Sequence, residues 1–269
     1  YEIPSEIGAL WIGTESCLKR FDLSKGQFSH YKKDLKNVNS LSHDHVRAIY
    51  EIPSNPGILW IGTFGGGLNR LNRKTGSITH FMSNPSDANS VSDNFVLNMM
   101  EDQSGVFWIG TEGGGLNRYD RTSKKFVLYQ HDPNDPNSLC SNHVRAIHES
   151  KKRPNVFWIG TYGGFDKFNK NTNTYTHYYY DPNNLNSLSS NLVRVIYEDK
   201  AGIVWIGTYN AGLNRVDPAK NKFKHYKHNP QDPYSLSHNY VRTLYEDHKG
   251  VLWIVSGGGG LNKFDRQKE

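Results

Sequence analysis

The chain has 269 residues, a formal net charge of +6, 36% hydrophobic residues and 13% aromatic residues, together with 25 glycines. This composition favours many short strands around a core of Trp, Tyr and Phe over a helical fold. No run approaches the roughly 18 apolar residues of a membrane-spanning helix, so we expect no membrane contact by this segment. Lys and Arg are spread over the whole chain, which argues against nucleic acid as a partner and for a solvated surface.

The N-terminal residues carry no charged start followed by an apolar run, so no targeting signal is visible. We therefore expect the chain to be a piece of a longer protein. Its two cysteines, Cys17 and Cys140, stand at unlike positions and show no metal-ligand spacing. We expect both to be free and inert, and we predict neither a metal nor a cofactor.

A Trp-Ile pair recurs along the chain at steps of 47 to 50 residues and accounts for every tryptophan. A fixed period in this range indicates an array of identical supersecondary units. The six tryptophans are Trp11, Trp60, Trp108, Trp158, Trp205 and Trp253. Each lies in a short apolar run, and the run around Trp108 is bounded by glycines, which is typical of a short strand. We predict that these side chains form the core between neighbouring units.

One complete unit can be followed along residues 142–190. Its apolar runs predict four strands, named a to d in chain order, at 144–149, 156–161, 165–168 and 174–179. A connection rich in Pro, Asn and Ser, 181–191, leads to the next unit. Four short antiparallel strands per unit are typical of one blade of a β-propeller. A solenoid or β-helix is the structural alternative, but its repeats are shorter and contain fewer strands.

The period divides the chain into six four-stranded blades within one all-β propeller region, residues 1–269. The expected blades are 1–43, 44–92, 93–141, 142–190, 191–238 and 239–269. The first blade lacks strand a and the last lacks strand d, so 22 strands are expected. Two interpretations remain open: a window cut from a longer array, or a six-bladed ring that lacks one segment. Because unpaired strands favour aggregation, we expect the native chain to be longer.

Five short motifs recur along the chain, and blade 5 shows all of them. They are Asn-Leu-Val-Arg-Val-Ile-Tyr-Glu-Asp (191–199), Gly-Ile-Val-Trp-Ile-Gly-Thr (202–208), Gly-Leu-Asn-Arg-Val-Asp (212–217), Phe-Lys-His-Tyr (223–226) and Pro-Tyr-Ser-Leu-Ser-His-Asn (233–239). This set resembles the two-component regulator propeller repeat, over essentially the whole chain. In that family such propellers form the extracytoplasmic sensor region of hybrid histidine kinases, and several sense oligosaccharides from polysaccharide breakdown.

The resemblance implies a sensor domain without catalysis of its own, in the periplasm or at the cell surface. It implies an oligosaccharide or a protein as ligand, and it leaves open a homodimer formed through the full-length protein. Three blades depart from the family pattern. Blade 1 has Glu15-Ser16-Cys17 in place of glycines, blade 4 has Phe165-Asp166-Lys167 in place of Leu-Asn-Arg, and blade 6 has Val255-Ser256 in place of Gly-Thr. We expect function where the copies differ.

The up-and-down strand order places the b–c turn and the d–a connection on one face of a blade. Polar and aromatic groups on such loops are the default ligand site. The predicted ligand-binding residues on this face are His45, Phe64, Phe95, His143, Tyr162, Arg194, Tyr209, His238 and Tyr240. The turn aromatics among them could stack on a sugar ring or simply cap the blade, and both interpretations stay open.

An arginine recurs near the start of strand a, as Arg47, Arg145, Arg194 and Arg242, with Leu97 in blade 3 as the exception. The interpretation favoured here is that these arginines pair with acidic groups between blades, such as Glu51 or Glu149. Contact with a ligand is the alternative.

Other functions are consistent with a propeller. The first is a lectin-like or protein-docking module unconnected to signalling, because propeller faces are common interaction platforms. The second is a propeller lyase or hydrolase, for which His43-Asp44-His45 is the nearest candidate. A catalytic site would break the repeat with clustered carboxylates or histidines, and the histidines here are scattered over loops. We therefore expect no catalytic residues.

Overall fold

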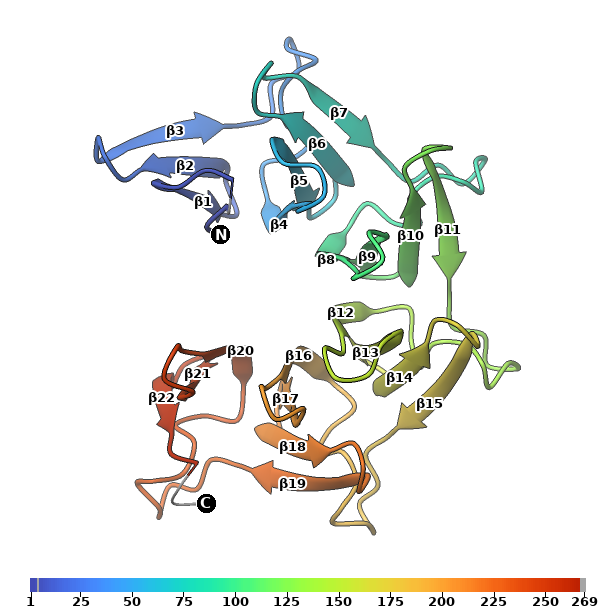
Figure 1. Ribbon diagram of the computed structural model, residues 1–269, viewed down its shortest axis with the longest axis vertical. Helices are drawn as coiled ribbons and strands as arrows, with labels where there is room; N and C mark the ends of the chain where they lie inside the picture. The colour runs from blue at the N-terminus through green and yellow to red at the C-terminus, as the bar shows by residue number, and fades with distance from the viewer. Residues whose placement is uncertain (4, 267–269) are drawn as a thin grey trace. The chain divides into compact units, whose positions relative to one another are not determined.

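The computed structural model describes residues 1–3 and 5–266, and every regular element in these ranges is a β-strand. The 22 strands form six antiparallel sheets, of which the first and last have three strands and the other four have four. Figure 1 follows them in chain order from β1 in blue to β22 in red. The predicted all-β propeller fold of six blades is confirmed, including the first blade without a strand a and the last without a strand d among the described residues.

The chain divides into two compact units, residues 1–130 with 142–144, and residues 131–141 with 145–269. That residues 1–269 form a single propeller region, with the blade boundaries expected above, stays a prediction. The described residues contain no helix that is long and apolar enough to cross a membrane.

The first unit contains blades 1 to 3. Their strands are β1 (Ala9–Gly13), β2 (Leu18–Asp22), β3 (Gln27–Tyr31), β4 (Val46–Glu51), β5 (Ile58–Thr63), β6 (Leu68–Asn72), β7 (Ile78–Phe81), β8 (Val96–Glu101), β9 (Phe107–Thr111), β10 (Leu116–Asp120) and β11 (Lys125–Tyr129). In blade 1 an isolated bridge between Glu2 and Leu10 lies where strand a stands in the other blades.

The second unit contains blades 4 to 6, although Val144, the first residue of β12, belongs to the first unit. The strands are β12 (Val144–Glu149), β13 (Val156–Thr161), β14 (Phe165–Asn169), β15 (Thr174–Tyr178), β16 (Val193–Glu198), β17 (Val204–Thr208), β18 (Leu213–Asp217), β19 (Lys222–Tyr226), β20 (Val241–Glu246), β21 (Leu252–Ser256) and β22 (Gly260–Phe264). The four strands of blade 4 match their predicted ranges to within one residue at every end.

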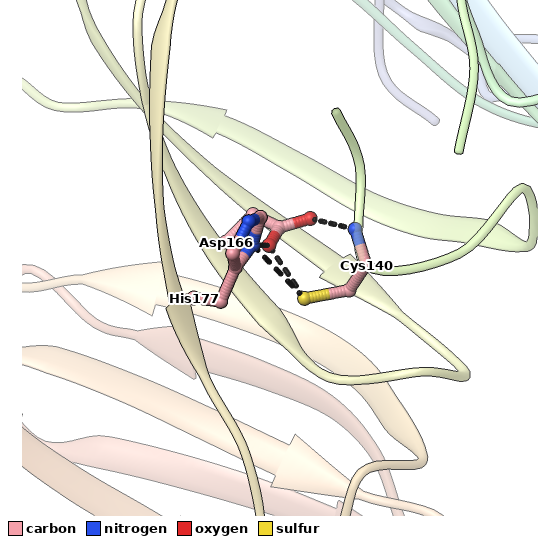
Figure 2. A group of neighbouring side chains, drawn as sticks. All are labelled: Cys140, Asp166 and His177. Atoms are coloured by element: carbon pink, nitrogen blue, oxygen red, sulfur yellow. Dashed lines mark hydrogen bonds and ion pairs between the residues drawn. The ribbon is translucent and has the colours of Figure 1, made fainter. Parts of the chain in front are cut away.

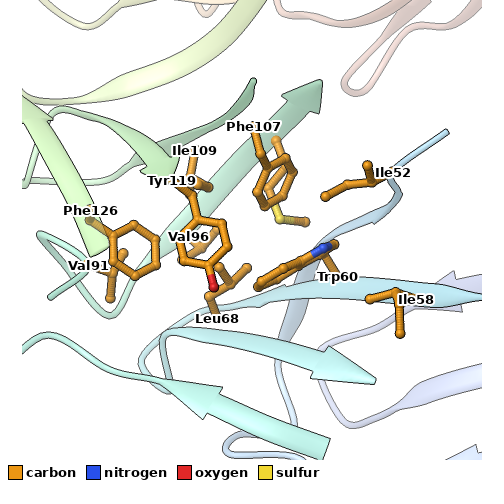
Figure 3. Close-up of a cluster of buried hydrophobic side chains, with 11 residues drawn as sticks. Ile52, Ile58, Trp60, Leu68, Val91, Val96, Phe107, Ile109, Tyr119 and Phe126 are labelled. Atoms are coloured by element: carbon orange, nitrogen blue, oxygen red, sulfur yellow. The ribbon is translucent and has the colours of Figure 1, made fainter. Parts of the chain in front are cut away.

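The tryptophan of strand b packs against the following blade. Trp60 of blade 2 lies 5.0 Å from the Phe107 ring and 5.5 Å from the Tyr119 ring of blade 3, centroid to centroid. Figure 3 shows these three side chains in one buried cluster. Burying a Trp removes about 150–250 Å² from water, which at ~25 cal/mol/Å² is an upper bound of roughly 4–6 kcal/mol. Five of the six tryptophans are at most 2% exposed, and Trp253 of the last blade is half-buried.

The glycine that follows Trp-Ile makes room for a valine of the next blade. A Cβ at Gly62 would lie 2.6 Å from Cγ1 of Val96, and one at Gly160 would lie 2.5 Å from Cγ1 of Val193. Each of these valines opens the strand a of the following blade. The glycines therefore allow the blades to approach closely, rather than providing space for the Trp ring.

An acidic side chain at the end of strand a accepts the indole N–H hydrogen bond of the tryptophan in its own blade. Asp102 accepts a hydrogen bond from Nε1 of Trp108 at 2.9 Å, and Asp199 accepts one from Nε1 of Trp205 at 3.0 Å. Asp199 also accepts the backbone N–H groups of the a–b turn. In blades 2 and 4 the turns differ in sequence, and the buried Nε1 atoms of Trp60 and Trp158 have no hydrogen-bond partner.

Replacing Asp199 with alanine is expected to lower the free energy of unfolding by about 1–3 kcal/mol, because a buried indole N–H loses its acceptor. The urea unfolding midpoint measures the effect. Asp232→Ala is the matched control, since Asp232 accepts the backbone N–H of Tyr234 in an exposed turn but binds no indole. Equal losses in the two variants would show that the turn, rather than the indole bond, determines the stability.

Candidate ligand site

In blades 2, 3 and 5 the b–c turn is held between two d–a connections by backbone hydrogen bonds. In blade 2 the N–H of Phe64 donates to the carbonyl of His45, and the N–H of Gly65 donates to the carbonyl of Asn94 in the next blade. In blade 5 the N–H of Tyr209 donates to the carbonyl of Leu192, and that of Gly212 to the carbonyl of Asn239. Turn residues and residues preceding strand a therefore alternate along one face.

In the first unit this alternation brings four predicted site residues into one row. The His45 ring lies 5.2 Å from the Phe64 ring, which in turn lies 4.5 Å from the Phe95 ring at 76°. The row continues through Glu112, whose N–H donates to the carbonyl of Phe95, to His143, whose Nδ1 lies 3.6 Å from a Glu112 carboxylate oxygen. We call His45, Phe64, Phe95, Glu112 and His143 the first row. Its members are all half-buried.

In the second unit three tyrosines form the corresponding second row, Tyr162, Tyr209 and Tyr240. The Tyr162 and Tyr209 rings are 6.5 Å apart, and the Tyr209 and Tyr240 rings are 4.5 Å apart. Tyr209 is 46% exposed and the other two are half-buried. All three rings of the second row carry a hydroxyl group, whereas the two rings at the centre of the first row are phenylalanines.

The recurring arginines lie over the aromatic side chains of these rows. Arg47 stands 5.9 Å from the Phe64 ring, Arg145 stands 4.7 Å from Tyr162, and Arg194 and Arg242 stand 5.0 and 5.2 Å from Tyr240. Cations within about 6 Å of a ring centroid are attracted by its negative face. The pairing register of strands β4, β16 and β20 skips one residue at the arginine. Such bulges turn a side chain away from the alternating in-and-out order of the strand. In these three strands the residue at the bulge is an arginine that lies over an aromatic ring of a row.

The expectation that Glu51 pairs with one of the recurring arginines is wrong. Glu51 forms its ion pair with Arg73 and accepts a hydrogen bond from the hydroxyl of Ser5 in the preceding blade. Arg47, the recurring arginine of the same strand, is separated from Glu51 by four residues of extended chain, which span about 13 Å. Desolvation acts to raise the pKa of Glu51, but hydrogen bonds from Ser5 and Gly57 and the charge of Arg73 leave that pKa below its ordinary value.

His238 lies beside the second row rather than in it. Its Nδ1 accepts the backbone N–H of Tyr240 at 3.0 Å and closes the turn before strand a. His43 does the same for His45 in blade 2, and Asp93 does so for Phe95 in blade 3. Because the same bond recurs with different residue types, the described role of His238 is structural.

The candidate catalytic triplet of blade 2 is also engaged in loop hydrogen bonds. His43 closes its turn as just described, and Asp44 accepts the backbone N–H of Lys33 at 2.7 Å. His45 faces Phe64 in the first row. These contacts point the three side chains to separate partners, so the triplet forms no shared hydrogen-bond relay.

A cluster that the sequence analysis missed lies in blade 4, and Figure 2 shows it. The Cys140 thiol donates to Oδ1 of Asp166 at 2.6 Å, and the same oxygen lies 2.6 Å from Nδ1 of His177. The sulfur lies 3.3 Å from that nitrogen. Asp166 is fully buried and Cys140 is 9% exposed. No spacing rule could find this group, because its members come from a connection, strand c and strand d.

The electrostatics of the cluster follow from burial and from the carboxylate. Burial raises the pKa of the Cys140 thiol, and the neighbouring Asp166 charge raises it further. The hydrogen bond to Asp166 raises the pKa of His177. Burial raises the pKa of Tyr179, whose hydroxyl shares a hydrogen bond with the thiol. The expectation of a free Cys140 holds, since it forms no disulfide, but its side chain has three polar neighbours.

A hollow of about 490 Å³ lies in the second unit, away from either row. It follows the outer side of β22, where the described residues supply no fourth strand, and Tyr234, Leu236 and Phe264 are among its lining residues. None of the predicted ligand-binding residues lines it.

Three segments of the chain match the family model described as two component regulator propeller, at residues 90–113, 187–210 and 235–258. Each segment runs from the end of a d–a connection, through strands a and b, to the b–c turn. These three segments carry the two-component regulator propeller repeat. The matched segments contain Phe95 and Glu112 of the first row and Tyr209 and Tyr240 of the second row. No curated protein matches the sequence.

Several solved structures share the fold of this chain at low sequence identity. One is the extracellular domain of the putative hybrid two component system BT3049 from B. thetaiotaomicron, with 24% identity, a TM-score of 0.64, and coverage of 95% of this chain and 38% of that one. A second is the extracellular domain of the putative one component system BT4673 from the same organism, with 22% identity, a TM-score of 0.60, and coverage of 97% and 39%. A third is PorZ, a surface component of the type-IX secretion system of Porphyromonas gingivalis, with 18% identity, a TM-score of 0.69, and coverage of 96% and 37%.

The chain therefore spans about two fifths of the length of these three structures. At such identities the likeness shows the fold alone. The regulator propeller repeats identify the kind of blade, and the rows show which of its loop residues come together.

Proposed function

We propose that this chain is a non-catalytic sensor propeller of a two-component signalling protein, located outside the cytoplasm, and that its second row binds an oligosaccharide. The observation that supports the ligand class is the row of Tyr162, Tyr209 and Tyr240 beneath Arg145, Arg194 and Arg242. Tyrosine rings offer flat apolar faces with a polar edge. Guanidinium groups offer several donors in a fixed plane. A chain of sugar rings presents the matching apolar faces and hydroxyl acceptors.

The regulator propeller repeats support the signalling role, and the extracellular domains among the similar structures support the location. Binding can produce a signal only when the ligand has different affinities for two states of the full-length protein. The propeller would supply the affinity, and parts outside this chain would supply the second state.

Glycan-array screening of the chain, followed by calorimetric titration of any oligosaccharide retained, tests this function. Tyr209→Ala is expected to weaken binding about tenfold or more, because a central aromatic contact is worth more than 1 kcal/mol. Tyr245→Ala is the matched control, since Tyr245 is exposed but stands near the far end of strand β20. The Tyr245→Ala substitution is expected to change the affinity for the oligosaccharide less than about twofold.

Two outcomes would contradict the proposal in different ways. Retention of no oligosaccharide would remove the ligand class and favour a protein-docking propeller. If an oligosaccharide is retained but the Tyr209→Ala and Tyr245→Ala variants lose equal affinity for it, the ligand class stands and the binding site lies elsewhere.

A further inference from the structure

Blade 4 replaces a neutral side-chain pair that blades 2, 3 and 5 share. In those blades an asparagine of strand c accepts the backbone N–H of a serine at 2.9 Å, and its Nδ2 donates to the serine hydroxyl at 2.8 to 2.9 Å. The pairs are Ser42 with Asn69, Ser92 with Asn117, and Ser189 with Asn214. Blade 4 has Cys140 and Asp166 at these positions and keeps the backbone bond, Cys140 N–H to Oδ2 of Asp166 at 2.9 Å.

The replacement is not needed for the fold, because the neutral pair holds the same turn in three other blades. It instead introduces a thiol and a buried carboxylate next to a histidine. A charged group is buried only at a large cost unless it is paired. The carboxylate of Asp166 is fully buried and has two donors on one oxygen, the Cys140 thiol and Nδ1 of His177. Asp, Cys and His are here together in one place with their ligating atoms facing one another.

We propose that Cys140, Asp166 and His177 form a binding site for a zinc-like divalent cation. Sulfur, imidazole nitrogen and carboxylate oxygen are the three donor types that Zn²⁺ takes in proteins. The three ligating atoms all lie within 4.8 Å of one another. This site is distinct from the second row and does not depend on the oligosaccharide.

The distances are consistent with a site that closes around the cation after modest movement. Tetrahedral Zn²⁺ with bonds of about 2.0 to 2.3 Å separates its ligand atoms by about 3.4 to 3.6 Å. The sulfur of Cys140 and Nδ1 of His177 already stand 3.3 Å apart. The Asp166 oxygen stands 2.6 Å from each of them, so it must retreat by about 1 Å, which rotation of the carboxylate can provide.

The surrounding contacts orient the ligands as metal sites require. Nε2 of His177 lies 2.8 Å from the carbonyl oxygen of Pro136, so this nitrogen is the donor and Nδ1 is the atom left for the cation. The second oxygen of Asp166 is fixed by the Cys140 N–H. With both histidine nitrogens donating hydrogen bonds, the cation displaces two protons, one from the thiol and one from Nδ1. Three protein ligands leave a fourth position for water.

Titration of the chain with Zn²⁺, after dialysis against a chelator, tests the site. We expect one Zn²⁺ per chain with a micromolar or lower Kd, and a rise in Tm of about 5 °C at a hundredfold excess over Kd. Co²⁺ used as a spectroscopic probe is expected to give a sulfur-to-cobalt charge-transfer band. Mg²⁺ is expected to give neither effect, because it binds oxygen ligands in an octahedron.

The double variant Cys140→Ser with Asp166→Asn restores the pair found in the other blades, so it is expected to fold. It should lose at least a hundredfold in Zn²⁺ affinity and all of the cobalt band. The converse variant builds the cluster in blade 2, where His80 stands opposite Asn69 in the strand pairing. Ser42→Cys with Asn69→Asp in that blade is expected to raise the stoichiometry from one Zn²⁺ per chain to two.

The outcomes separate a metal site from a hydrogen-bonded cluster. Absence of Zn²⁺ binding by the chelator-treated chain would overturn the proposal and leave the three residues as a hydrogen-bonded substitute for Ser and Asn. Zn²⁺ binding that the Cys140→Ser, Asp166→Asn variant retains would overturn it as well, because the cation would then bind other ligands.

Discussion

Trp205→Ala is expected to lower the free energy of unfolding by about 3–5 kcal/mol, the range observed for large aromatic residues in cores. Trp205 is 1% exposed and lies in a buried cluster with Val241, Leu244 and Ile254 of the next blade. Its ring stands 5.1 Å from the Phe264 ring at 69°. Removal of the ring leaves a cavity between blades 5 and 6. It also removes the indole N–H that donates a hydrogen bond to Asp199. Chemical denaturation followed by circular dichroism measures the loss.

Trp253→Ala is the matched control for this experiment. Trp253 occupies the same position in blade 6 and donates the same indole hydrogen bond, to Asp247 at 2.9 Å. It is only half-buried, whereas Trp205 is 1% exposed. Its replacement is expected to cost less than half as much. Equal costs would show that the tryptophan stabilises its own blade rather than the contact between blades.

The blade pattern could be predicted because each strand is defined by local sequence. Alternation, glycine turns and the fixed spacing of Trp-Ile place the strands without knowledge of any tertiary contact. Blade 4 was therefore predicted to within one residue at every strand end. The role of the glycine after Trp-Ile could not be identified in this way, because the atom that it avoids, Cγ1 of Val193 in the case of Gly160, belongs to another blade.

The candidate ligand site was predicted in its residues but not in its contacts. Loop position alone selected Phe64, Tyr209 and Tyr240. The contact between a turn residue of one blade and the residue before strand a of the next depends on how the two repeats pack. Tyr209 and Tyr240 are an example. The arginines were assigned to acidic partners because charge is visible in a sequence, whereas the bulge at Arg194 that accompanies its place over Tyr240 is not.

The cluster of Cys140, Asp166 and His177 shows the same limit. The departure of blade 4 at Asp166 was visible, and so was a cysteine in the connection before it. The three side chains come together through two tertiary contacts. The connection packs on strand c, and His177 lies opposite Asp166 in the strand pairing. An alignment of the six copies by strand position would have placed the three residues in register, because the equivalent residues in blade 5 are Ser189, Asn214 and His225.

Gly160→Ala is expected to destabilise the second unit by about 1–3 kcal/mol, the cost of adding a methyl group to a packed contact. The new Cβ would lie 2.5 Å from Cγ1 of Val193 and 3.2 Å from Cδ1 of Ile196. Backbone strain does not contribute, because Gly160 has no positive φ. The equivalent position in blade 6 holds Val255, so a side chain is compatible with the strand conformation itself. Urea denaturation measures the change.

A second substitution in the partner distinguishes crowding from other causes. Val193→Ala removes the atom that the new Cβ would meet, so Gly160→Ala should cost less in the Val193→Ala background than alone. The coupling free energy in this double-mutant cycle is expected to be about 1 kcal/mol or more in the favourable direction. Strict additivity would mean that Gly160 does not serve the approach of the two blades.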